Sequence, residues 1–186
     1  MRMKALSAAL AVTCLAMFSV GPAPARAAEA TATGLWQKIE NDRPAAWFVF
    51  VEREGLYEGA IAKIFPKPGD DPSPRCRKCQ DDRKDMPIVG LPLVRDMKRV
   101  GLKYEGGNIL DPRDGKIYKA LMRVSPDGET LTLRGYLAVE WLGKDEIWHR
   151  LPDSAIAQLD RSVVAKYQLA PPRRPDAGKK AAAPTR

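Results

Sequence analysis

Two cysteines and a single histidine are the side chains of this sequence best suited to chemistry. Cys76 and Cys79 form a C-x-x-C motif among prolines and basic residues. The motif is compatible with a structural disulfide, with thiol exchange or with part of a metal site. Redox enzymes place it at a helix N-terminus beside a βαβ pattern, and zinc requires four ligands. We expect a structural disulfide contributing about 2 kcal/mol, with redox exchange and metal binding as alternatives.

The sequence around His149 offers no catalytic partner. Strand alternation places His149 on the face opposite Trp148 and Arg150, and no serine or cysteine nucleophile with a third member stands out for it to activate. An acid and base pair could in principle be drawn from five carboxylates: Glu58, Glu105, Asp111, Asp114 and Glu140. Asp111 and Asp114 are ordinary turn residues. We therefore expect no enzyme, no metal and no cofactor unless such groups converge on a cleft.

The N-terminal residues 1–27 have the organisation of a secretory signal peptide. Two basic residues precede an apolar run from Ala5 to Val20, and an A-x-A ending predicts cleavage after Ala27 or one residue later. The run is short for a membrane span, and the residues before Cys14 fit a lipobox poorly. We expect a periplasmic protein that does not span the membrane, in a compartment where Cys76 and Cys79 would pair.

The formal net charge of +8 belongs mostly to the two ends of the chain. The leader carries +3 and residues 171–186 carry +4, which leaves +1 for residues 28–170. Nucleic-acid binding by the folded part therefore loses its main support. The proline- and alanine-rich tail has too little apolar surface to fold, so we expect a disordered basic terminus. It would act as a solubilising end or, alternatively, contact an anionic surface.

The cysteines, the histidine and the carboxylates must be positioned by the elements between them. These elements are short runs of β-branched and aromatic residues separated by turn signals, which predict β-strands. The predicted strands cover residues 35–40, 46–53, 56–65, 88–94, 102–110, 116–124, 130–142 and 146–150. Gly135 either bends the long seventh run or divides it, which gives eight to nine strands. An antiparallel up-and-down β-barrel over residues 28–152 removes the sheet edges, and a two-sheet sandwich is the competing architecture.

The pattern changes to helical spacing after Pro152. One amphipathic helix is predicted over residues 154–168, within a C-terminal segment 153–170, and Asp153 or Ser154 can cap it. Its apolar residues are Ile156, Leu159, Val163, Val164 and Tyr167. We expect this stripe to dock on the barrel, with a partner-binding helix as the alternative.

Several short motifs occur in a specific order along the predicted barrel. They are Gly34-x-Trp36, Phe65-Pro66-Lys67-Pro68-Gly69, Cys76-x-x-Cys79, Pro87-Ile88-Val89-Gly90-Leu91, Gly106-Gly107-x-Ile109-Leu110-Asp111-Pro112, Gly115-Lys116-x-Tyr118, Arg134-Gly135-Tyr136 and Trp148-x-Arg150. In this order the chain resembles the exported bacterial proteins grouped as domain of unknown function 2147, over residues 34–150. The resemblance implies a periplasmic lipocalin-like barrel without implying a reaction. In lipocalins the G-x-W tryptophan closes the barrel floor beneath an arginine of the last strand, which would pair Trp36 with Arg150.

Aromatic residues are spread over almost every predicted strand and would line the barrel. Trp47, Tyr104, Tyr118 and Trp141 are the candidate ligand-binding residues. Our first hypothesis is an exported, non-enzymatic barrel that binds a small apolar or amphipathic ligand in the cell envelope. The alternative is a structural or interaction module with a filled barrel that contacts an envelope protein. An interior cavity above about 300 Å³ would favour the first hypothesis, and a filled interior would exclude it.

Overall fold

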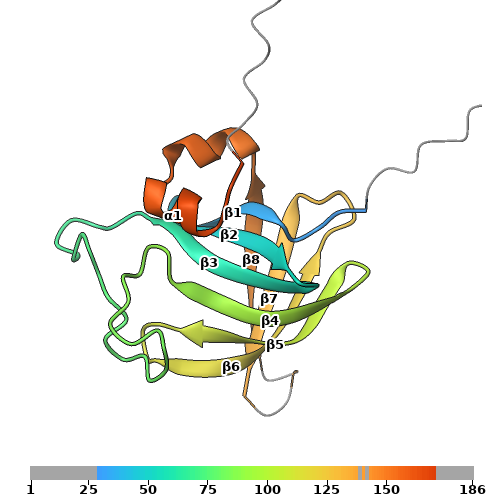
Figure 1. The fold of residues 1–186 in the computed structure, drawn as a ribbon, viewed down its shortest axis with the longest axis horizontal. Coiled ribbons are helices and arrows are strands. Elements are labelled where there is room, and N and C mark those ends of the chain that lie inside the picture. The colour runs from blue at the N-terminus through green and yellow to red at the C-terminus, as the bar shows by residue number, and fades with distance from the viewer. Residues whose placement is uncertain (1–28, 138–139, 141–142, 171–186) are drawn as a thin grey trace, which may run out of the picture.

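The computed structural model describes residues 29–137, 140 and 143–170. Eight antiparallel strands follow one another in sequence order, and the first pairs with the last, so the sheet closes into an up-and-down barrel (Figure 1). Closure removes the unpaired edges that an open sheet of this size would expose. The predicted all-β barrel with a C-terminal helical segment is confirmed, and the sandwich alternative is excluded.

The strands agree with the predicted runs except in two places. Their bounds are β1 Gly34–Glu40, β2 Arg43–Arg53, β3 Leu56–Ile64, β4 Pro92–Val100, β5 Lys103–Asp111, β6 Lys116–Val124, β7 Thr130–Tyr136 and β8 Lys144–Leu151. Each consecutive pair is antiparallel, as tight turns such as those before Gly115 and Gly128 require. Both of these glycines have positive φ values.

The prediction of a strand over residues 88–94 was wrong. Residues 88–91 form a turn, and β4 continues instead through the charged sequence from Arg95 to Val100. Asp96 has a positive φ of 62°, and the pairing of β3 with β4 shifts register twice around this region. This irregularity keeps Met97 fully buried while neighbouring charged side chains face water, a pattern that simple alternation did not reveal.

The long run predicted over residues 130–142 was also wrong in its extent. β7 ends at Tyr136, and β8 begins at Lys144, earlier than expected. Gly135 does not divide a strand, because it pairs with Ala120 on one side and Lys144 on the other. A side chain there would approach Ile109 inside the barrel to 3.3 Å, so the position favours glycine for close packing.

The C-terminal segment contains two short helices instead of the single helix predicted over residues 154–168. The 3₁₀ helix η2 spans Asp153–Gln158, and the α-helix α1 spans Arg161–Lys166. Leu159 between them is extended, and Asp160 caps α1 by accepting a hydrogen bond from the Ser162 amide at 2.7 Å. The capping aspartate starts a new helix because its side chain satisfies an amide that a continuous helix would have paired internally.

The segment docks on the outside of the barrel, over β1 to β3 (Figure 1). Leu159, Val163 and Tyr167 are buried there against apolar residues such as Val49 and Ala60. The expectation of docking on the same chain is therefore confirmed, although the helical geometry differs. Among the described residues, no helix is both long enough and apolar enough to cross a membrane.

Candidate functional site

One end of the barrel is closed by residues 29–33, which run across it before β1 begins. Trp36 and Ala32 are fully buried there, and the Trp36 indole donates a hydrogen bond to the Ala32 carbonyl at 2.8 Å. The Tyr104 hydroxyl accepts a hydrogen bond from the Ala32 amide at 2.8 Å. This end, which we call the floor, is thus held by hydrogen bonds between the N-terminal segment and barrel side chains.

Arg150 fastens the floor from the last strand. Its guanidinium lies 4.1 Å from the centre of the Trp36 ring, so the contact expected between these two residues is present. The same group donates to the carbonyls of Thr31 at 2.5 Å, Thr33 at 3.0 Å and Gly128. Burial lowers the pKa of Arg150 because desolvation disfavours its charged form. Each of its three guanidinium nitrogens donates a hydrogen bond within the protein, which indicates a structural role.

The barrel interior is filled by side chains. Phe48 stacks on Trp148 with ring centres 3.8 Å apart, and Tyr57 meets Tyr104 edge to face at 4.7 Å. Large interior residues that are less than 2% exposed are Trp36, Phe50, Met97, Tyr104, Met122, Leu131 and Trp148. The close packing of these described residues favours a filled interior over a ligand-sized cavity.

The three candidate ligand-binding residues that the structure describes, Trp47, Tyr104 and Tyr118, do not meet in one pocket. Tyr104 is inside the barrel, where its hydroxyl is occupied at the floor. Tyr118 lies near the opposite end, and its hydroxyl donates to Asp114 at 3.0 Å within the β5–β6 turn. Trp141 lies outside the described residues. The expectation of an aromatic-lined ligand pocket in the interior therefore receives no support from these positions.

Trp47 lies on the outer face of the barrel instead of lining its interior. It pairs with Gln37, and its indole donates to the Gln37 amide oxygen at 2.9 Å. Phe65 packs against it edge to face at 5.6 Å, and the Lys63 ammonium lies 4.7 Å from its ring centre. Alternation gives β2 apolar residues on both faces, because the C-terminal segment covers the outer one.

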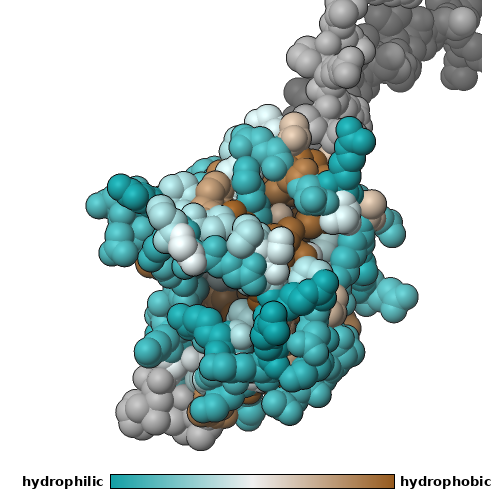
Figure 2. Space-filling model, turned by 90° about the vertical axis from the view of Figure 1, so that its left-hand side faces the viewer, coloured by the Kyte–Doolittle hydropathy of each residue, from teal (hydrophilic) through white to brown (hydrophobic). Residues whose placement is uncertain are grey.

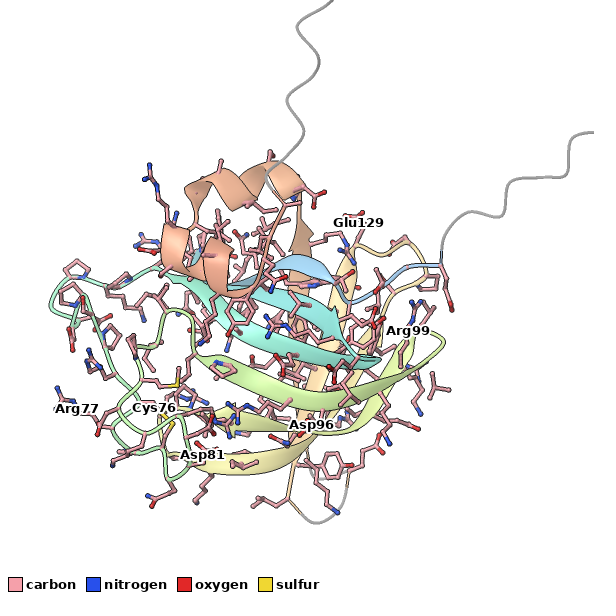
Figure 3. The ribbon with its side chains drawn as sticks, in the orientation of Figure 1. Cys76, Arg77, Asp81, Asp96, Arg99 and Glu129 are labelled. Atoms are coloured by element: carbon pink, nitrogen blue, oxygen red, sulfur yellow. A yellow bond between two sulfur atoms is a disulfide. The ribbon has the colours of Figure 1, made fainter. Side chains whose placement is uncertain are left out.

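The end opposite the floor is covered by the long connection between β3 and β4, residues 65–91. Cys76 and Cys79 form the expected disulfide in this loop, and both are fully buried. Figure 3 shows Cys76 and Asp81 in this loop and Arg99 at the other end of the barrel. A disulfide indicates an oxidising, non-cytoplasmic compartment. Complete burial makes thiol exchange at this bond unfavourable, which leaves the structural interpretation as the best supported.

A buried arginine, which the sequence reasoning missed, anchors the loop. Arg83 is 1% exposed, contacts both Asp81 carboxylate oxygens and donates to the Pro92 carbonyl at 3.1 Å. The hydrogen bonds from Arg83 lower the pKa of Asp81 to about 2. Arg95 forms a second bidentate pair with Asp82, with both distances 2.8 Å. The only available signal was local, an aspartate two residues before an arginine, which does not reveal burial.

A charged layer of Lys38, Glu40 and Glu146 joins β1 to β8 next to the aromatic interior. Lys38 donates to Glu146 at 2.7 Å and lies 2.9 Å from Glu40. Although burial works against its charged form, these two carboxylates raise the pKa of Lys38. The Trp148 indole donates to Glu146 at 3.2 Å, so the layer is joined to the core beneath it. Its hydrogen bonds are made within the protein, which indicates a structural cap.

The residues considered for catalysis lie on different elements, and four of the five carboxylates contact a neighbouring group. His149 is exposed on the outer face of β8, opposite Thr130. Glu105 lies 3.5 Å from Lys103, Glu58 lies 3.9 Å from Arg53, and Asp111 is bound by Arg113 in its own turn. Within the described part of the chain, no three His, Cys, Asp or Glu side chains are arranged to hold a metal ion.

An open groove of about 690 Å³ lies outside the barrel. Its walls are the end of β3 from Ala62 to Ile64, the loop from Pro72 to Arg75, and residues 158–160 of the C-terminal segment. We call it the outer groove. Figure 2 views this side of the molecule, where hydrophobic side chains interrupt an otherwise hydrophilic surface. The sequence could not predict this groove, because it forms where residues 62–75 meet residues 158–160, which are distant along the chain.

Comparison with known proteins agrees with this architecture. Residues 34–150 match the family described as "Uncharacterized protein conserved in bacteria (DUF2147)". No curated protein matches the chain at a significant level. A solved structure, protein HP1028 from Helicobacter pylori, described as belonging to the lipocalin family, is similar with a TM-score of 0.60 and 22% identity. The similarity covers 74% of this chain and 98% of that chain, and at this identity it shows a shared lipocalin-like fold.

Proposed function

The chain belongs to the bacterial family of uncharacterized proteins DUF2147, and from this premise we propose that it is a non-enzymatic binding module of the cell envelope that contacts its ligand or partner through its outer surface. The barrel acts as a rigid scaffold, and the C-terminal segment and the disulfide loop supply the contact surface. The proposal keeps the filled barrel of the alternative hypothesis, which expected contact with an envelope protein, and extends the contact to a ligand. A small ligand inside the barrel is the competing function.

The filled interior is the observation that supports this proposal. Trp36, Met97, Tyr104 and Met122 are all fully buried, as expected where side chains pack closely against one another. Both ends are also covered, by residues 29–33 at the floor and by the loop carrying the buried Arg83 at the other end. A ligand could enter only if the tightly packed core rearranged, which costs far more than binding at a surface already formed.

The proposed location is the periplasm. The buried disulfide supports an oxidising compartment, and the predicted signal peptide of residues 1–27, which lies outside the described residues, provides the route of export. The predicted basic terminus, residues 171–186, also lies outside the described part of the chain. Its role as a solubilising end stays a prediction.

Methionine methyl NMR tests the proposal directly. After residue 28 the sequence contains three methionines, and two of them, Met97 and Met122, are fully buried inside the barrel. The third, Met86, lies in the loop between β3 and β4. We expect a total lipid extract of the cell envelope to leave the Met97 and Met122 methyl signals unchanged. Saturable shifts of both signals would instead place the ligand in the interior and overturn the proposal.

A further inference from the structure

We propose that the outer groove binds a small amphipathic anion, that is, a carboxylate or phosphate monoester attached to an apolar chain. This inference rests on the proposed function, because it assigns a ligand chemistry to the outer surface. It places the ligand between the disulfide loop, β3 and the C-terminal segment, on the outside of a filled barrel.

The size and walls of the groove suit the apolar part of such a ligand. Its volume of about 690 Å³ lies within the range of about 300–1,000 Å³ that is usual for small-molecule sites. Ala62, Ile64, Val89 and Leu159 supply apolar surface. Four further wall positions are prolines, at residues 66, 72, 74 and 87. Proline has no amide N–H, so these walls offer apolar surface with few backbone donors.

Two cations at the groove are placed to bind the carboxylate or phosphate group of such a ligand. The half-buried Lys63 ammonium lies 4.7 Å from the Trp47 ring centre and 5.3 Å from that of Phe65. Arg75 is exposed, and one of its guanidinium nitrogens donates to the Asp85 carbonyl at 2.6 Å. Neither cation forms an ion pair with a carboxylate of the described residues. Both therefore keep donors for a ligand oxygen.

The one carboxylate of the lining accepts its hydrogen bonds through a single oxygen, Oδ1. Asp160 accepts hydrogen bonds from the Ser162 amide at 2.7 Å and the Ser162 hydroxyl at 2.6 Å, where it caps α1. Lys63, Arg75 and Asp160 together give the lining a net charge of +1. Because the lining carries two cations without carboxylate partners and one carboxylate, its net positive charge favours an anion over a cation.

Titration calorimetry with three probes of eight carbons each tests the assignment. We expect octanoate and octyl phosphate to bind saturably and at least about tenfold more tightly than 1-octanol, since hydrogen bonds to charged groups contribute about 1.5–3 kcal/mol. Tight binding of octanoate alone assigns a carboxylate ligand, and of octyl phosphate alone a phosphate ester. Equal affinities for the three probes, or no saturable binding, would overturn the proposal.

Four variants locate the binding. Lys63→Gln should weaken binding of the anionic probes about tenfold and spare 1-octanol, and Lys63→Arg should preserve it. Lys119→Gln, an exposed cation on β6, is the matched control and should change nothing. Ser73→Trp, on an exposed groove wall, should block all three probes. Equal behaviour of Lys63→Gln and Lys119→Gln would refute the assignment.

The two proposals fail in different ways. If octanoate shifts the Met97 and Met122 methyl signals, the ligand lies in the interior and the proposed function itself is wrong. If those signals stay unchanged but the Lys63 and Ser73 substitutions have no effect on binding, only the assignment to the outer groove is wrong.

Discussion

Arg150 shows how much a single side chain can organise in this fold. Its planar guanidinium reaches three backbone carbonyls in different directions while lying over the Trp36 ring. A lysine ammonium at the same position would keep the charge but not this fork of donors. The residue connects the last strand to residues 31–33, so it fixes the N-terminal segment across the barrel floor.

We predict that Arg150→Ala lowers the free energy of unfolding by about 2–4 kcal/mol, because it leaves three partly buried hydrogen bonds to carbonyls unmade and removes the contact with Trp36. The free energy of unfolding of Arg150→Lys should lie between those of Arg150→Ala and the wild type. Urea unfolding followed by tryptophan fluorescence measures both. Arg123→Ala, on the exposed face of β6, is the control, and a loss no larger than that of Arg123→Ala would contradict the structural part given to Arg150.

At the scale of elements, the two covering segments are held by different means. The disulfide loop depends on polar anchors, above all the buried Arg83 with its Asp81 partner. The C-terminal segment depends on apolar burial together with two hydrogen bonds to the Gly90 carbonyl, from Lys166 at 2.8 Å and from the Tyr167 hydroxyl at 3.0 Å. Gly90 belongs to the loop, so the two segments also support each other.

The docking of the C-terminal segment should weaken at alkaline pH, because it requires Tyr167 in its neutral form. Burial raises the pKa of Tyr167 to about 12 from its ordinary value of 10.0, because desolvation disfavours the phenolate. Between these two pH values the unfolded state loses this proton and the folded state keeps it. The stabilisation is therefore complete below pH 10 and is lost as pH rises to about 12, by an amount of order 2 kcal/mol.

Urea unfolding of wild type and Tyr167→Phe between pH 9 and about 12 measures this effect. The variant should be less stable at pH 9 by about 1 kcal/mol, through loss of the bond to Gly90, and its stability should then decline less steeply. Parallel declines of the two proteins would show that Tyr167 ionises equally in both states, and would contradict its docking in the neutral form.

At the scale of the whole molecule, the barrel is closed, its two ends are covered and its core is tightly packed. Leu133 on β7 is 2% exposed inside it, whereas Leu121 on β6 is half-buried on the outside. We predict that Leu133→Ala lowers the free energy of unfolding by about 2–5 kcal/mol, because shortening a side chain in a tightly packed core leaves a cavity. Leu121→Ala should cost about 1 kcal/mol or less.

Urea unfolding of both leucine variants provides the measurement, and xenon uptake provides an independent one. Leu133→Ala should gain a xenon site that the wild type lacks, because a dry apolar cavity accepts such atoms. Xenon uptake by the wild-type interior, or equal costs for the two variants, would contradict a filled barrel.

The sequence by itself determined the class of fold and most of the strands. Tight turns and apolar runs with two-residue spacing are local properties, and they predicted the antiparallel neighbours and the barrel formed by β1 to β8. The disulfide was also predictable, because Cys76 and Cys79 are three residues apart. The motif in β1 and the arginine near the end of β8 predicted the contact between Trp36 and Arg150 through resemblance to lipocalins.

Only the tertiary structure decided which surfaces are available for binding. Trp47 looked like a lining residue because β2 is apolar on both faces, and its outward position depends on the segment that covers it. The extent of β4 depends on a register shift at Asp96, and the burial of Arg83 depends on how a long loop docks. The outer groove brings residues 62–75 together with residues 158–160. Local patterns do not encode such contacts, because they arise when segments far apart in sequence pack against one another.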